Sequence, residues 1–294
     1  LFEYRAELAF KHPEVGQILE RAPKADRKKM GLMRSMFFGE TGPFWATFWA
    51  SLGFEPVWSS PTNKSIIHRG CERVGSEFCF PIKAAHGHLL DLDEKKPDYI
   101  FLPSLVNLPS GGIAGGQEGT PPPDNAACPY VQSLAYTAPA ALNLQTPLIS
   151  GPVFFGEGEK VLWDCLADIA KPLGISKNQV KEAMHEAMLA QTNFTRRLTD
   201  KGAEMLAGLG PDDKAMVVVA RPYNGFDPGL NLRLSQKLAD LDVLGIPMDF
   251  LPLDTNSGEA ASHYWRYGQK ITAAADRIAE DERLEALDSS NFGC

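Results

Sequence analysis

The chain has 294 residues, of which 44% are hydrophobic and 22% charged, and its formal net charge is −8. This composition excludes global disorder, and an acidic chain without a basic block is a poor binder of nucleic acid or anionic membranes. No apolar run approaches the ~20 residues of a membrane span, and no basic-then-apolar leader opens the chain. A chain of this length is expected to bury a substantial core.

Charged side chains dominate the first 29 residues, which predict a helical arm or connector. Apolar residues then recur at helical spacing from Pro43 to Leu52, and Gly53 ends the pattern. The aromatic side chains of this helix are expected in the core: Phe44, Trp45, Phe48 and Trp49.

Short elements are predicted along the rest of the first half. Residues 54–59 predict a strand, residues 70–80 a loop and residues 82–92 a helix. The continuous apolar run over 99–103 is typical of a buried parallel strand, and residues 147–155 resemble another strand and its exit.

A long helix is the clearest prediction for the second half. Ser176 is a suitable N-cap, and apolar residues recur at helical spacing towards residue 210. Residues 214–219 then predict the sharpest strand of the chain. Further elements are expected over 221–228 (loop), 231–244 (helix), 247–253 (strand) and 262–279 (helix).

Strands thus alternate with helices on both sides of the long helix, which indicates an α/β fold of two units with parallel sheets. We divide the chain into a helical arm or connector (1–29), a first unit (30–175), a bridging helix (176–210) and a second unit (211–294), which we expect to be cut short at its C-terminus.

Most familiar cofactor motifs are missing from the sequence. There is no dinucleotide-binding or P-loop glycine pattern and no nucleophile elbow. The glycines within 108–125 belong to a long irregular loop, which is either functional or a surface excursion. His86 and His88 lie two residues apart, a spacing that does not bring two ligands to one helix face.

The five cysteines are odd in number and widely spaced, which argues against an extracellular disulfide framework and predicts a cytoplasmic protein. There is no C-x-x-C pair, so neither a zinc ribbon nor a thioredoxin-like site is indicated. Each cysteine taken alone is more often a small buried hydrophobe. They are Cys71, Cys79, Cys128, Cys165 and Cys294.

Three of these cysteines lie in loop-like segments near predicted strand ends. Pro81 follows Cys79, Pro129 follows Cys128, and Gly293 precedes Cys294. Proline stiffens a loop and glycine permits close backbone approach. Thiolates on short rigid loops are what an iron–sulfur cluster requires, although spacing alone makes this a weak indication.

Several short motifs, in this order, resemble the 2-hydroxyacyl-CoA dehydratase D-component superfamily, in its activase-associated branch. Its relatives include 2-hydroxyglutaryl-CoA dehydratase, benzoyl-CoA reductase subunits and double-cubane cluster proteins. The matching segments are 43–45, 52–54, 76–83, 86–88, 98–103, 128–129, 220–224, 227–228, Asn231 and 291–294.

The resemblance implies two flavodoxin-like or Rossmann-like units, with an iron–sulfur cluster in the cleft between them. By motif position the metal ligands are Cys79, Cys128 and Cys294, whereas Cys71 and Cys165 match no ligand position. A [4Fe–4S] cluster held by three thiolates keeps one iron open. Relatives of the same fold carry a double-cubane cluster instead, and the sequence does not choose between the two.

The resemblance also implies a partner and a reaction. An ATP-dependent activase of the BadF/BadG/BcrA/BcrD type would supply a low-potential electron for radical dehydration or reduction of an acyl-CoA, with a possible second dehydratase subunit. One alternative is a double-cubane reductase of small molecules. Another is a non-catalytic electron-transfer or scaffold domain of a fused activase.

Further residues receive weaker assignments. Glu77 and His86 are candidate catalytic residues: Glu77, with Lys83, could tune the cluster or move protons, and His86 could donate to a cluster sulfur. A solvated ion pair and a core histidine are the competing interpretations. The loop after the best strand offers ligand-binding candidates for a carboxylate or phosphate, although Arg221 could instead bridge the sheets structurally. These candidates are Arg221, Tyr223 and Asn224.

Overall fold

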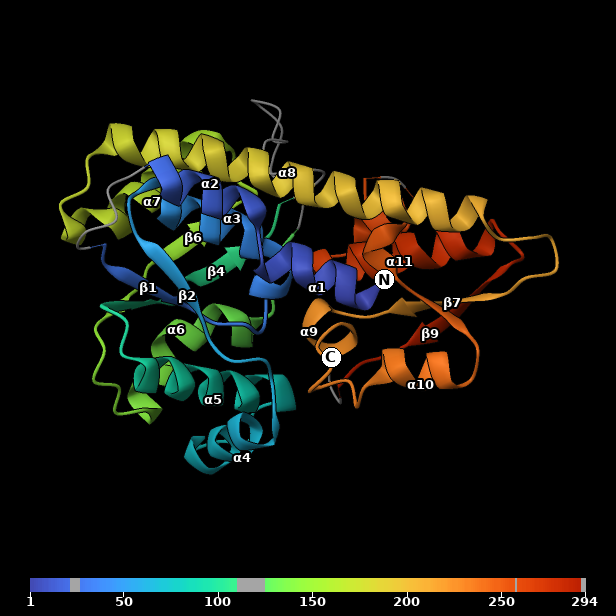
Figure 1. The fold of residues 1–294 in the computed structure, drawn as a ribbon, viewed down its shortest axis with the longest axis horizontal. Coiled ribbons are helices and arrows are strands. Elements are labelled where there is room, and N and C mark those ends of the chain that lie inside the picture. Colours follow the sequence, from blue (N-terminus) through green and yellow to red (C-terminus); the bar gives the residue numbers. More distant parts are fainter. Residues whose placement is uncertain (22–26, 110–124, 257, 292–294) are drawn as a thin grey trace.

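The computed structural model describes residues 1–21, 27–109, 125–256 and 258–291. Within them the chain is an α/β protein with two parallel-sheet units joined by a long helix, as predicted (Figure 1). None of the helices among these residues is both long and apolar enough to cross a membrane.

The first unit is built on a four-stranded parallel sheet with the order β2-β1-β3-β5. A parallel pair, β4 and β6, continues beyond β3 and β5. The short apolar runs form buried strands because helices cover both faces of a parallel sheet. The strands are β1 (Lys29–Leu32), β2 (Glu55–Trp58), β3 (Tyr99–Phe101), β4 (Ser104–Asn107), β5 (Leu148–Ile149) and β6 (Pro152–Phe154).

The second unit holds a three-stranded parallel sheet in the order β8-β7-β9. Its central strand is the predicted one, β7 (Ala215–Val219), flanked by β8 (Leu244–Pro247) and β9 (Leu284–Asp288). The helices of this unit are α9 (Pro222–Gly225), α10 (Leu234–Asp240) and α11 (Arg266–Ala279), with 3₁₀ turns at Met248–Phe250 and Ala260–Ser262.

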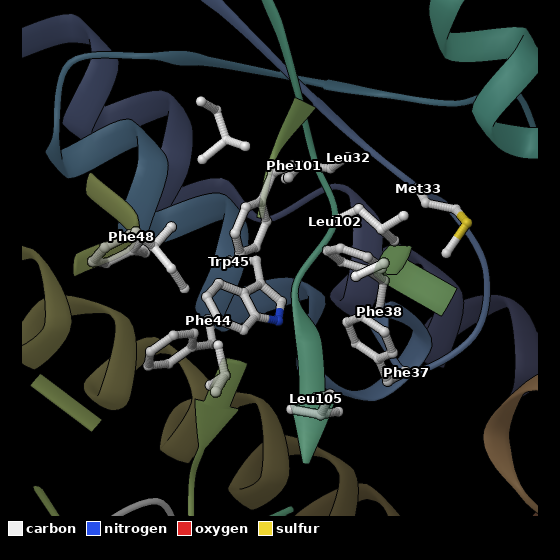
Figure 2. Close-up of a cluster of buried hydrophobic side chains, with 14 of the residues drawn as sticks. Leu32, Met33, Phe37, Phe38, Phe44, Trp45, Phe48, Phe101, Leu102 and Leu105 are labelled. Atoms are coloured by element: carbon white, nitrogen blue, oxygen red, sulfur yellow. The ribbon is translucent and has the colours of Figure 1, made fainter. Parts of the chain in front are cut away.

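Helices of the first unit surround an aromatic core (Figure 2). The expected aromatic residues are all buried, and the Trp45 ring lies 4.9 Å from the Phe44 ring and 4.7 Å from the Phe101 ring, centroid to centroid. Such offset and edge contacts add to the burial of large apolar surfaces. These helices are α3 (Phe38–Ser51), α4 (Lys64–Arg73), α5 (Phe80–Lys95), α6 (Pro129–Ala141) and α7 (Glu159–Ala170), followed by a 3₁₀ turn at Lys171–Leu173.

The bridging helix α8 (Lys177–Ala207) runs along both units (Figure 1). The Ser176 hydroxyl accepts a hydrogen bond from the Gln179 N–H, and the Gln179 side chain accepts one from the Ser176 N–H, which completes a capping box. Near its other end, Gly202 lies so close to the second unit that a Cβ there would be 1.9 Å from the Phe250 carbonyl oxygen. The helix therefore joins the two units through packed contacts.

The N-terminal arm is helical, as expected, but it is not a simple connector. It forms α1 (Phe2–Phe10) and α2 (Pro13–Arg21). Phe2, Leu8 and Ala9 are buried in the apolar core of the second unit. The apolar residues among the charges at helical spacing explain this packing.

Other local predictions were wrong or incomplete. Residues 70–73 of the expected loop over 70–80 belong to the end of α4. Of the strand expected over 247–253, only Pro247 lies in a strand, because a 3₁₀ turn begins at Met248. Strands β1, β4 and β9 were not anticipated. These strands are short or carry charged residues, so their pattern alone is weak.

Buried polar side chains link the two units. Arg5 of α1 bonds Asp249 of the second unit at 2.7 Å, and Thr62 donates to Asp227 at 2.5 Å. Glu40 of α3 forms an ion pair with Lys270 of α11. Burial by itself raises the pKa of Glu40, but the charge and hydrogen bond of Lys270 outweigh burial and leave the pKa below its usual value.

Glu40→Gln should lower the free energy of unfolding by about 3 kcal/mol, because Lys270 is left as a buried unpaired charge. The folded-state pKa of Glu40 lies below that of the unfolded chain. Its contribution is therefore present above the unfolded pKa, about 4.3, and is lost as the pH falls through the folded value. Denaturant unfolding at pH 7 and below pH 4 measures both effects.

Glu94→Gln, which breaks the more exposed pair with Arg69, is the control and should lower the free energy of unfolding by less than about 1 kcal/mol. Equal losses at both positions would contradict the account.

Candidate functional site

A cavity of about 880 Å³ lies where the two units face each other. It brings together residues from the first unit, the loop after β7 and the segment after β9. Ligands of open α/β sheets bind beyond the carboxyl ends of strands, and this cavity lies beyond the carboxyl ends of β7 and β9. Its lining is Met36, Glu77, Phe78, Cys79, Phe80, Ile82, Cys128, Pro129, Tyr130, Arg221, Tyr223, Trp265 and Asn291.

Cys79 is the N-cap residue of α5, and its side chain lines the cavity. Its carbonyl accepts the first hydrogen bonds of the helix, from the N–H groups of Ile82 and Lys83, both at 3.1 Å. Pro81 in the first helical turn fixes the backbone direction there. The thiol therefore projects from a rigid helix start, where the helix dipole favours negative charge.

Cys128 repeats this arrangement on a second helix. It is the N-cap residue of α6, Pro129 is the first helical residue, and its carbonyl accepts from Val131 at 2.8 Å. Both thiols line the same cavity, although they follow different parts of the sheet. Two helix N-termini and two soft sulfur donors thus converge on one space.

The cavity wall beside the cysteines is aromatic. Phe78 and Tyr130 meet edge to face with ring centroids 5.3 Å apart. Phe80, Tyr130 and Trp265 are partly exposed, between 37% and 42%. Phe80 and Trp265 therefore bring aromatic surface from both units to the cavity.

His86 lies behind this wall and does not line the cavity. Its ring stacks on Phe78 at 6.2 Å and is fully buried. Burial lowers the pKa of His86, although the hydrogen bond with the Ile82 carbonyl opposes this effect. Because a carbonyl only accepts, the His86 Nδ1 carries the proton that it donates to the Ile82 carbonyl at 2.8 Å. Within the described part of the chain, the buried Nε2 has no hydrogen-bond partner. These contacts agree with a core histidine rather than a donor into the cavity.

Glu77 and Lys83 form an ion pair at 3.1 Å. Glu77 lines the cavity but its side chain is 97% exposed, so the pair is largely solvated. Solvated pairs contribute little to stability or to tuning a buried group.

The three ligand-binding candidates surround the short helix α9. Arg221 is its N-cap, donates to the Tyr223 hydroxyl at 3.0 Å and lies 5.9 Å from the Tyr267 ring. Arg221 and Tyr223 line the cavity, whereas Asn224 is buried and accepts a hydrogen bond from Asn291. Asn224 therefore holds the segment after β9 against the cavity.

The other cysteines are placed differently. Cys294 lies outside the described residues. Cys71 is exposed on α4, and burial raises the pKa of the Cys165 thiol on α7. Neither lines the cavity. Across the described part of the chain, no three His, Cys, Asp or Glu side chains gather into a metal-binding group.

Two residues of the site were missed from the sequence. Met36 is buried and has a positive φ of 54°, an uncommon conformation for a residue other than glycine. Trp265 is the N-cap of α11. Neither position carries a local sequence signal, because both reach the cavity only through the packing of the two units.

Comparison with known proteins identifies the family of this chain. No curated protein matches it. A model described as the CoA enzyme activase uncharacterised domain (DUF2229) matches residues 29–251, about three quarters of the chain, including Cys79, Cys128 and the Arg221 loop. The chain therefore belongs to the CoA enzyme activase uncharacterised domain family, which links it to CoA-enzyme activation systems.

Proposed function

We propose that Cys79, Cys128 and Cys294 hold an iron–sulfur cluster that receives low-potential electrons from an ATP-dependent activase. The observation that carries the proposal is the convergence of Cys79 and Cys128, each at a helix N-terminus, on one cavity between the units.

The residues present fit such a group. Thiolates are the ligands that iron–sulfur clusters use, and helix N-termini stabilise the negative charge that a thiolate-ligated cluster carries. Asn291 lines the same cavity, and Cys294 follows it by three residues in the sequence, which supports Cys294 as the third ligand. Phe78 and Tyr130 would restrict water at the thiolates.

When bound, such a cluster supplies one-electron transfer and, at an open iron, Lewis acidity. The chain's own residues would provide the surroundings. Arg221, held by the Tyr223 hydroxyl, offers a cation to a carboxylate or phosphate of an acyl-CoA substrate. We propose radical dehydration or reduction of that substrate as the reaction.

A second candidate is an electron-transfer domain of an activase that does not itself turn over a thioester. The description of the matching family, as a domain of CoA enzyme activases, favours it. Both candidates require the cluster, and they differ in whether a substrate reacts at the cavity.

An activase-coupled assay separates them. With activase, ATP and a reductant, a dehydratase converts a 2-hydroxyacyl thioester to the enoyl thioester, and Arg221→Gln should lower this turnover at least tenfold. Reduction of the protein without any thioester turnover would leave the electron-transfer domain as the function. Absence of activase-dependent reduction would contradict both candidates.

A further inference from the structure

A second, smaller cavity lies beside the first. The Arg34 pocket, as we name it, encloses about 120 Å³ between α1, the loop after β1, the loop after β2 and the residues after α9. Its polar lining residues include Arg34, Ser35, Thr62 and Asp227. Met36 and Tyr223 line both cavities, so the two share a wall.

The fold places this pocket where α/β proteins bind ligands. In the first sheet, β2-β1-β3-β5, the chain passes from β1 to β2 on one side and then crosses to β3 and β5 on the other side. The strand order therefore reverses between β1 and β3. The crevice beyond the carboxyl ends of such strands is the usual ligand site. Arg34 and Ser35 lie just after β1 and Thr62 lies after β2, so the pocket is beyond the carboxyl ends of these two adjacent strands, next to the switch point.

Ser35 contributes a buried hydroxyl that makes no hydrogen bond within the described part of the chain. Its side chain is 4% exposed, and among the residues that the structure describes its Oγ has no hydrogen-bond partner. A buried hydroxyl without a partner costs free energy that a bound polar group would recover. Since Ser35 lines the pocket, the pocket is where such a group would be.

Arg34 contributes an available cation. Its guanidinium stacks over the Phe10 ring at 4.6 Å, and its backbone N–H donates to Ser59 Oγ at 2.7 Å. Burial lowers the pKa of Arg34, and the nearby charge of Asp227 opposes this. In the described parts of the chain, its guanidinium has no hydrogen bond or ion pair.

The other charged groups at the pocket already have partners. Arg5 bonds Asp249 at 2.7 Å and the Gly39 carbonyl at 3.0 Å. Asp227 accepts from Thr62 Oγ1 at 2.5 Å and from the Gly229 N–H at 2.9 Å. Thr62 is held in turn by His88 at 2.9 Å. Among the described side chains that line the pocket, Arg34 and Ser35 therefore have donors left for a ligand.

We propose that the Arg34 pocket binds a small monoanionic carboxylate, which accepts hydrogen bonds from the Arg34 guanidinium and the Ser35 hydroxyl. A planar carboxylate matches the fork of a guanidinium. The nearby carboxylate of Asp227 adds negative charge at the pocket and disfavours a dianion such as phosphate more than a monoanion. The volume approaches that of the ~150 Å³ cavity which admits benzene, so the ligand has about four to six non-hydrogen atoms. This site does not depend on the cluster.

Isothermal titration of the full chain with sodium acetate, with acetamide and sodium phosphate as matched probes, tests the proposal. Acetate should bind at least tenfold more tightly than acetamide, which has the same shape without the charge. Arg34→Gln should weaken acetate binding at least tenfold. Arg69→Gln, at a partly exposed arginine paired with Glu94 outside the pocket, should leave acetate binding unchanged.

Ser35→Ala keeps the proposal testable if Arg34→Gln does not fold, because it removes only a hydroxyl without a partner. It should weaken acetate binding several-fold while leaving the circular dichroism spectrum unchanged. Equal binding of acetate and acetamide, or full binding by both pocket variants, would overturn the site. Tighter binding of phosphate than of acetate would overturn the carboxylate assignment.

Discussion

Replacing Cys79 or Cys128 with alanine should reduce the iron bound per chain to background, while the chain stays folded. Each thiol lies at a helix start on the wall of the same cavity. A three-thiolate site that loses one ligand keeps only two, which does not retain a cluster. Iron and sulfide assays after anaerobic reconstitution, with circular dichroism, measure the result.

Cys71→Ala and Cys165→Ala are the matched controls. Cys71 is exposed on α4 and Cys165 lies on α7, and neither lines the cavity. Both variants should bind as much iron as the unmodified chain. The account of the ligands is wrong if these variants lose iron and the Cys79 variant keeps it. Cys294→Ala should behave like the Cys79 variant, because the resemblance gives Cys294 the third position.

Gly87→Ala should lower the free energy of unfolding by about 3 kcal/mol or more, since it forces apart two closely packed helices. A Cβ at Gly87 of α5 would lie 1.9 Å from the Ile66 carbonyl oxygen of α4. A Cβ at Gly70 of α4 would lie 2.0 Å from the Lys83 carbonyl oxygen of α5. Backbone atoms cannot rotate aside as a flexible side chain can, so the helices must separate.

The effect should reach the site, because α5 carries Cys79 at its start. Chemical denaturation measures the loss of stability, and the rate of iron release to a chelator measures the change at the cavity. Gly16→Ala is the control, since Gly16 is also helical and has no atom within 4 Å of its Cβ position. It should stabilise the chain by up to about 1 kcal/mol. Similar changes in unfolding free energy at both glycines would show that helix propensity, and not packing against α4, determines the effect of Gly87→Ala.

Much of the fold could be predicted because single segments carry strong patterns. The apolar runs at Tyr99–Phe101 and Ala215–Val219 are continuous, and Ser176 with Gln179 makes a capping box. Strand β9 (Leu284–Asp288) could not be predicted, because three of its residues are exposed or charged and only its pairing with β7 makes it a strand. The burial of α1 likewise depends on a surface far away in the sequence.

Some residues of the candidate site could likewise be predicted from the sequence, and others could not. Cys79 and Cys128 could be singled out because proline follows each within two residues, and the structure shows why: proline starts the helix that each cysteine caps. His86 lies in the same motif but faces the core behind Phe78. Sequence spacing cannot separate a cavity-lining residue from one packed behind it. Met36 and Trp265 lack any pattern, because only the packing of the units brings them to the cavity.

Iron and acid-labile sulfide per chain, measured on the anaerobically reconstituted full-length protein with the EPR spectrum of its reduced form, test the central claim most directly. The account predicts about four irons with matching sulfide for a single [4Fe–4S] cluster, or about eight for a double cubane, and an EPR signal on reduction. Zinc without sulfide, or no bound metal at all, would contradict it.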